Sequence, residues 1–126
     1  MLGDAQVGAV LPVKDLEAAK KFYSETLGLK AGEESPGGIL FSAGGGSKVF
    51  VYPTQFAGTN QATAAGFEID DVEGVATALK DKGVTLEHYD LPGVTMDGDI
   101  HVMGELKAIW FKDPDGNIIS VTNMMG

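Results

Sequence analysis

Two histidines and a group of aspartates are the residues whose types could perform metal or acid–base chemistry. His88 and His101 are the only histidines of the chain, and Asp90, Asp97 and Asp99 lie between them. Imidazole and carboxylate groups together suit zinc, iron or manganese, so a metal site on His88 and His101 is one interpretation. Their spacing matches no compact ligand motif, and histidines in an acidic loop are also typical of a solvated segment. Both interpretations stay open.

Glu68 is the second candidate, as a general base. Alternation along a strand at residues 64–69 places Glu68 on the opposite face from Phe67. A carboxylate beside apolar neighbours such as Phe50 can take up a proton in catalysis. Lys48 is expected on the same face, where its ordinary role would be to neutralise the carboxylate.

The composition excludes several classes of function. The chain has 126 residues, which predicts one domain, and its net charge of −9 disfavours nucleic acid and anionic membranes as partners. The absence of cysteine excludes thiol nucleophiles and iron–sulfur clusters and fits a reducing compartment, so a cytoplasmic location is expected. All nine basic residues are lysines, and a chain without arginine is a poor binder of phosphorylated ligands.

The sequence repeats one plan twice. Residues 13–17 (VKDLE) recur as residues 69–73 (IDDVE), each after an apolar segment and before a run with helical periodicity. Asp15 and Asp71 are predicted to cap the two helices, and Gly28 and Gly83 to end them.

The repeat predicts an α+β fold of two βαβββ modules. Module one would span residues 5–53 and module two residues 64–123, with residues 54–63 as the linker. The modules would form a cupped, mostly antiparallel sheet with the helices on its outer face. Strands are expected at residues 6–13, 29–33, 39–43, 48–53, 64–69, 84–89, 106–112 and 117–122, with a long loop at residues 90–104.

Strand alternation divides the side chains between two faces. Val7, Phe67 and Ile69 are among the residues expected beneath the helices. The other face is mixed in size and polarity, as expected for the lining of a ligand cavity. The predicted ligand-binding residues on that face are Gly8, Val10, Lys48, Phe50, Tyr52, Ala64 and Ser120. Trp110 is a further predicted ligand-binding residue, although alternation leaves open whether Trp110 or Phe111 faces the cavity.

Three motifs in this order resemble the vicinal oxygen chelate superfamily, which includes glyoxalase I, extradiol dioxygenases and bleomycin-resistance proteins. The first is VKDL at residues 13–16, followed by Phe22-Tyr23 and by LGL at residues 27–29. The second is FEIDDV at residues 67–72, and the third is WFKDPDGN at residues 110–117. The DPDG segment of the third predicts a turn that serves the fold rather than the chemistry.

The resemblance implies a divalent ion held by the first and the last strand of each module. The matching positions here are Gly8, Phe50, Ala64 and Ser120, and none is a histidine, glutamate or glutamine. The sequence therefore predicts a protein without metal or other cofactor that binds a small apolar or aromatic molecule at the interface of a homodimer. The alternative is a glyoxalase-like or dioxygenase-like enzyme that uses Glu68 or a relocated metal.

Overall fold

The computed structural model describes residues 1–124 and shows two modules that each begin with a strand and a helix and continue into further strands. In module one, β1 (Ala9–Val13) and α1 (Leu16–Lys21) precede β2 (Lys30–Ser35), β3 (Gly38–Ser42) and β4 (Lys48–Pro53). In module two, β5 (Thr63–Glu68) and α2 (Val72–Asp81) precede β6 (Leu86–Glu87), β7 (Thr95–Asp97), β8 (Ile100–Met103), β9 (Leu106–Lys112) and β10 (Ile118–Thr122). The α+β fold predicted from the repeat is confirmed.

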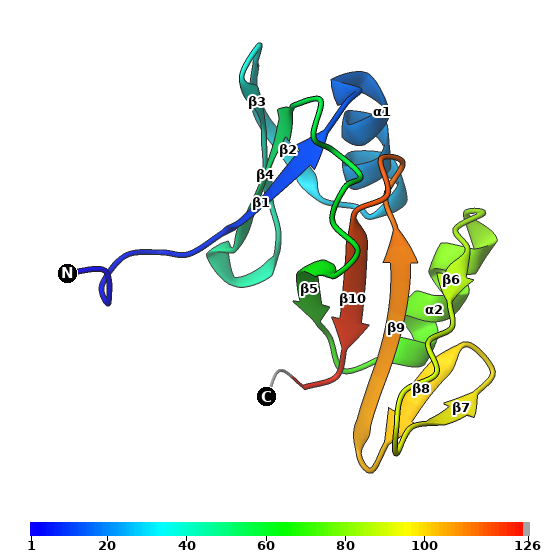
Figure 1. Ribbon diagram of the computed structural model, residues 1–126. Helices are drawn as coiled ribbons and strands as arrows, with labels where there is room; N and C mark the ends of the chain where they lie inside the picture. The colour runs from blue at the N-terminus through cyan, green and yellow to red at the C-terminus, as the bar shows by residue number, and fades with distance from the viewer. Residues whose placement is uncertain (125–126) are drawn as a thin grey trace.

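Each module forms one mixed sheet whose first strand runs parallel to its last. The first sheet has the order β1-β4-β3-β2 and the second the order β5-β10-β9-β8-β7, with β6 beside β9. Only β1 with β4 and β5 with β10 are parallel pairs. The edge strands β1 and β5 contact each other, so the two sheets meet along these edges (Figure 1).

The strand register confirms the predicted division of the two faces. Val10 lies beside Phe50 in the first sheet, and Ser120 lies between Gly66 and Trp110 in the second. Neighbours in register share a face. The alternate residues point toward the helices and form the core, which includes Leu11, Ile39, Phe41, Val51, Ile109, Phe111 and Ile119.

The helices begin and end where the sequence predicts. The Asp15 carboxylate accepts hydrogen bonds from the N–H groups of Glu17 (3.0 Å) and Ala18 (3.2 Å), and Asp71 accepts one from Gly74 (2.9 Å). After α1 the chain continues through a π-helical turn, Phe22–Thr26. Gly28 and Gly83 follow the helices with φ of 79° and 85°, which glycine adopts without a steric penalty. Among residues 1–124, no helix is long and apolar enough to cross a membrane.

The first strand of module one is shorter than predicted, whereas β5 of module two has the predicted length and lies one residue earlier. β1 begins at Ala9 because its partner β4 begins at Lys48, so residues 6–8 have no strand beside them. Val7 is therefore 91% exposed instead of lying beneath a helix. Ile69 follows the end of β5 and is also exposed, but it borders the same helix-side cavity as Phe67, so only the assignment of Val7 is wrong.

The predicted loop at residues 90–104 contains a hairpin that adds two strands to the second sheet. β7 and β8 pair across Asp97 and Ile100, and Gly98 takes the left-handed conformation in the turn with φ of 63°. Strands of three and four residues are too short for alternation to reveal them. The predicted strand at residues 84–89 is reduced to Leu86–Glu87.

A buried carboxylate joins the two modules. Asp113 begins the predicted DPDG turn, and its Oδ2 accepts hydrogen bonds from the Tyr23 hydroxyl (2.7 Å) and the Asn117 side-chain amide (2.8 Å). Its Oδ1 accepts the backbone N–H groups of Asp115 (3.0 Å) and Asn117 (2.8 Å). The Asn117 amide also donates to the carbonyl of Pro12 at 2.7 Å. Because Tyr23 and Pro12 belong to module one, this network fixes the position of one module against the other.

Replacing Tyr23 by phenylalanine should destabilise the protein by about 1–3 kcal/mol, because the buried Asp113 carboxylate would lose one donor. Tyr52→Phe is the matched control, since Tyr52 is only half-buried and lies on the other face of the first sheet. Urea unfolding of both variants measures the difference. Equal stability of the two variants would contradict the structural role of the Tyr23–Asp113 bond.

Candidate functional site

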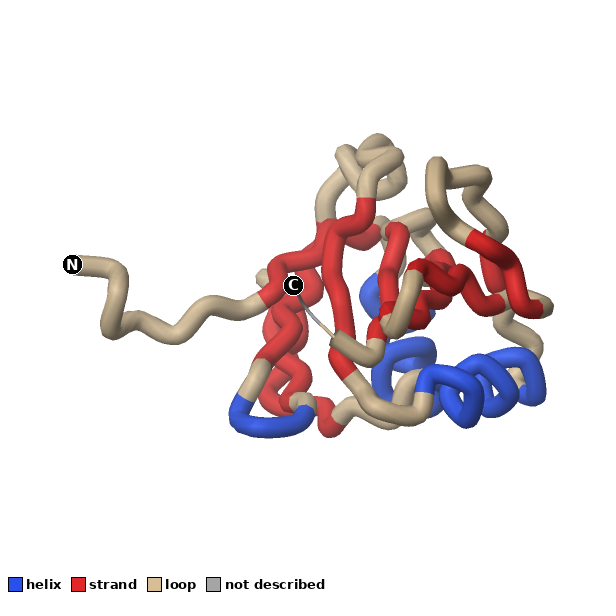
Figure 2. Tube along the Cα trace, turned by 90° about the horizontal axis from the view of Figure 1, so that it is seen from below, coloured by secondary structure: helices blue, strands red, loops and turns tan. Residues whose placement is uncertain are grey.

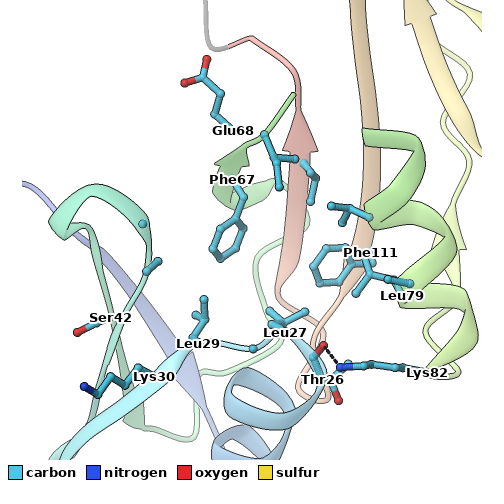
Figure 3. A pocket seen from close by; sticks show the side chains of 17 residues that line it. Thr26, Leu27, Leu29, Lys30, Ser42, Phe67, Glu68, Leu79, Lys82 and Phe111 are labelled. Carbon is cyan, nitrogen blue, oxygen red and sulfur yellow. Dashed lines mark hydrogen bonds between the residues drawn. The ribbon is translucent and has the colours of Figure 1, made fainter. Parts of the chain in front are cut away.

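A cavity of about 610 Å³ opens between the two modules on the helix side of the sheets. Module one contributes the segments around Leu29 and Ser42, and module two contributes β5 and α2 (Figure 3). Most of the lining side chains are apolar. They include Leu27, Leu29, Phe67, Val75, Ala78, Leu79, Phe111 and Val121.

Phe67 lies at the centre of this wall, and its ring points into the cavity (Figure 3). The sequence places Phe67 on the helix-facing side of β5, and the register with Val121 confirms that side. However, Phe67 is only half-buried, because module one leaves a gap beside it where the prediction expected helix packing. Residues assigned to the core thus form the wall of a cavity.

The polar side chains at the cavity are directed away from its centre or already bonded. The Lys82 ammonium donates to the carbonyls of Glu25 (2.9 Å) and Thr26 (3.2 Å), which ties α2 to the end of the π-helical turn. Glu68 borders the cavity, but its carboxylate points away from the Phe67 ring (Figure 3). This orientation gives no support to Glu68 as a general base in this cavity.

The predicted ligand-binding residues lie elsewhere. Except for Glu68, the residues singled out for the cavity face do not line the 610 Å³ cavity. Gly8 and Lys48 instead border a hollow of about 410 Å³ beside the turn at residues 45–47. Phe50, Tyr52, Ala64 and Trp110 are half-buried, Ser120 is buried and Val10 is exposed. Alternation alone could not reveal Phe67 or Leu29 as cavity residues, because it cannot distinguish a core position from a cavity wall.

The positions that the resemblance assigns to a metal do not fit a divalent ion. Gly8 and Ala64 have no donor atom, the Phe50 side chain is a hydrocarbon ring, and the Ser120 hydroxyl is a single weak ligand. Within residues 1–124, no three His, Cys, Asp or Glu side chains lie close enough together to hold a metal ion.

The two histidines have different environments. His101 lies on β8, is only 2% exposed, and its Nε2 accepts the backbone N–H of Tyr89 at 2.9 Å. His88 is exposed, and its Nε2 lies 2.7 Å from Asp99, which also binds Lys80. The view of both histidines as solvated loop residues is therefore wrong for His101. The relocated metal site gains no support either, because each Nε2 already has a hydrogen-bond partner.

An aromatic cluster surrounds His101. The Trp110 ring packs edge-on against it with 4.7 Å between the centroids, and the Tyr89 ring lies 6.1 Å away. Burial, together with the nearby His88, lowers the pKa of His101 below its usual value. Hydrogen bonds from Lys80 and from His88 lower the pKa of the Asp99 carboxyl.

The lowered pKa of His101 predicts that the protein loses stability in mild acid. The unfolded chain takes up a proton on this histidine near its ordinary pKa of about 6.5, while the folded protein resists protonation. The free energy of unfolding should therefore fall as the pH drops through about 6.5 and continue to fall toward the lower pKa of the folded state.

Urea unfolding followed by the fluorescence of Trp110, the only tryptophan, measures this dependence. His101→Gln should reduce the slope with pH strongly, and His88→Gln should reduce it less, because burial is the largest cause of the lowered His101 pKa. A slope that is the same in all three proteins would contradict the assignment to His101.

Comparisons with known proteins agree with the motifs and the fold. Residues 6–121 match the family model described as the Glyoxalase/Bleomycin resistance protein/Dioxygenase superfamily. A lactoylglutathione lyase from Agrobacterium tumefaciens superposes with a TM-score of 0.72 at 21% identity, over 94% of this chain and 92% of that one. An antibiotic binding protein from Streptomyces sp. CB03234 superposes with a TM-score of 0.65 at 23% identity, over 94% and 95%.

A third similar structure contains a metal. The fosfomycin resistance protein of Listeria monocytogenes, solved with Mn(II) and sulfate, superposes with a TM-score of 0.71 at 16% identity, over 97% of this chain and 91% of that one. At such low identities, these structures establish a shared fold only. Because the family model covers nearly the whole chain, the protein belongs to the glyoxalase/bleomycin resistance protein/dioxygenase superfamily.

Proposed function

We propose that this protein binds a small apolar or aromatic molecule in the cavity between its modules and uses no metal ion or other cofactor to do so. The observation that carries the proposal is the cavity itself. Its volume of about 610 Å³ falls within the range of small-molecule sites, roughly 300–1,000 Å³, and its wall is mainly apolar.

The wall favours a flat apolar ligand. The rings of Phe67 and Phe111 and the side chains of Leu29 and Leu79 offer dispersion contacts and area burial. Burial of apolar area contributes about 25 cal/mol per Å², and an aromatic pair adds about 0.5–1.5 kcal/mol. With Lys82 already bonded and Glu68 directed outward, a charged group at the centre of the cavity would lack a partner.

The lack of metal-donor side chains at the four inherited positions favours ligand binding over metal-assisted catalysis. Members of the superfamily include enzymes as well as binding proteins, and the similar structures carry both kinds of name. In this chain, Gly8, Phe50 and Ala64 cannot coordinate an ion, and Ser120 alone cannot hold one against water. The enzymatic alternative would need ligands from elsewhere in the fold.

Obstructing the mouth of the cavity should weaken binding. Ala78 is an exposed residue of α2 that borders the cavity, so Ala78→Phe places a ring at the opening without disturbing the core. The probe is the uncharged dye N-phenyl-1-naphthylamine, whose emission rises in apolar sites. We expect its affinity to fall about tenfold or more, equivalent to a loss of about 1.4 kcal/mol.

Thr77→Phe is the matched control, because Thr77 is exposed on the same helix and does not border the cavity. It should bind the probe as the unaltered protein does. If both variants bind equally well, or if the unaltered protein binds no probe, the cavity is not the ligand site.

The protein should also be isolated without a stoichiometric divalent metal. Elemental analysis after dialysis tests this expectation, which follows from the absent donor atoms at the inherited positions. One tightly held zinc, iron or manganese ion per chain, lost on substitution of His88 or His101, would overturn the proposal that the protein uses no metal.

We further propose a homodimer, with a cytoplasmic location. Both modules of one chain line the 610 Å³ cavity, so the proposed dimer is not required to complete it. The dimer therefore needs a contact surface of its own.

A further inference from the structure

A second hollow adjoins the apolar cavity at Lys82. It has a volume of about 430 Å³ and lies where the chain after α2 and the DPDG turn meet the π-helical turn of module one. We call it the polar cleft, because apolar and polar side chains alternate around it. They include Phe22, Val84, Thr85, Glu87 and Lys112. Among the described residues, the cavity and the polar cleft share only Thr26 and Lys82.

The two residues that both hollows share are hydrogen-bonded to each other. The Lys82 Nζ donates to the carbonyl of Thr26 at 3.2 Å and to the neighbouring carbonyl of Glu25 at 2.9 Å. Figure 3 shows the Lys82 side chain crossing from α2 to Thr26 at one end of the apolar wall. The side chain therefore lies on the boundary of the two hollows and separates them.

Both ends of this link are fixed by helix termini. Lys82 is the C-cap residue of α2, and its backbone N–H donates to the carbonyls of Ala78 (3.2 Å) and Leu79 (3.1 Å). Glu25 and Thr26 end the π-helical turn, where carbonyls lack intrahelical partners and the helix dipole favours a cation. Figure 2 shows α2 along one side of the strands, with the helical segment of module one beside it. The ammonium thus bridges the ends of two helices.

Carbonyl oxygens alone hold the ammonium of Lys82. Within residues 1–124, this lysine forms no ion pair. Hydrogen bonds from a charged donor are stronger than those between neutral groups, so two of them keep the side chain across the boundary. Substitution of Lys82 leaves no unpaired carboxylate behind, and its exposed position keeps the core intact.

We propose that Lys82 closes one end of the apolar cavity and thereby limits the length of the ligand that the cavity accepts. A longer ligand must either leave part of its surface in solvent or displace the ammonium from both carbonyls. Without the Lys82 side chain, the cavity and the polar cleft would form one elongated site. This inference deepens the proposed function and rests on it, because it makes Lys82 a specificity-determining residue of the same cavity.

Rigid, uncharged rods of increasing length test this limit. The series is trans-stilbene, diphenylbutadiene and diphenylhexatriene, measured by displacement of N-phenyl-1-naphthylamine. In the unaltered protein, we expect the affinity to stop rising with length, because the added part of the rod stays in solvent. In Lys82→Ala the added part enters the polar cleft, so diphenylhexatriene should bind about tenfold or more tightly than it binds the unaltered protein.

Three further variants control for charge, for the carbonyl link and for the polar cleft. Lys21→Ala removes the same charge from an exposed position of α1 outside both hollows, and Lys82→Arg retains donors for the carbonyls. Both should keep the length limit of the unaltered protein. Thr85 is exposed and borders only the polar cleft, so Thr85→Trp fills the cleft. Combined with Lys82→Ala, it should remove the tenfold gain.

The compact probe N-phenyl-1-naphthylamine should bind all these variants with equal affinity. The same dependence on rod length in the unaltered protein and in Lys82→Ala would overturn the proposal, as would a gain that persists when Thr85→Trp is added. Weaker binding of diphenylhexatriene by Thr85→Trp alone would overturn it too, since the rod would then reach the polar cleft past Lys82. This last result does not require Lys82→Ala to fold. An unaltered protein that binds no N-phenyl-1-naphthylamine would instead refute the proposed function of the cavity.

Discussion

The buried carboxylate of Asp113 is the interaction on which the arrangement of the two modules depends. A charged group in the interior is costly unless donors surround it, and here the Tyr23 hydroxyl, the Asn117 amide and two backbone N–H groups do so. Burial and the Asp113 charge raise the pKa of the Tyr23 phenol, so that it remains a donor. Since Tyr23 lies in the π-helical turn that follows α1 and Asp113 begins a turn of module two, one cluster defines the mutual position of the two modules.

The cavity follows from the way this hydrogen-bond network holds the two modules together. The modules are held together where the Tyr23 segment meets the DPDG turn, and Phe22 packs against Phe111 with 6.2 Å between the ring centroids. Lys82 adds a second link from α2 to the carbonyls of Glu25 and Thr26. The edge strands β1 and β5 also contact each other, and a space lined by Phe67 and its neighbours remains between the modules on the helix side. The same contacts that stabilise the pair of modules therefore set the size of the proposed ligand site.

This chain retains the superfamily fold while lacking the donor atoms of a metal site. The elements that define the fold, namely the helix caps at Asp15 and Asp71 and the DPDG turn, are all present and make their expected hydrogen bonds. The positions that the resemblance assigns to metal ligands are occupied by glycine, alanine, phenylalanine and serine. Fold and chemistry separate here because the fold rests on caps, turns and core packing, whereas coordination needs particular donor atoms.

The sequence by itself determined the repeat, the superfamily, both helix starts and stops, and the faces of the main strands, because these follow from local periodicity, capping and turn chemistry. It could not show the β7–β8 hairpin, whose strands are too short to display a period, or the early end of pairing before Ala9, which depends on where β4 begins. Only the tertiary structure decided that His101 is buried and that Phe67 faces a cavity. Such properties depend on how residues distant in the chain pack around a side chain, and alternation within one strand carries no information about that packing.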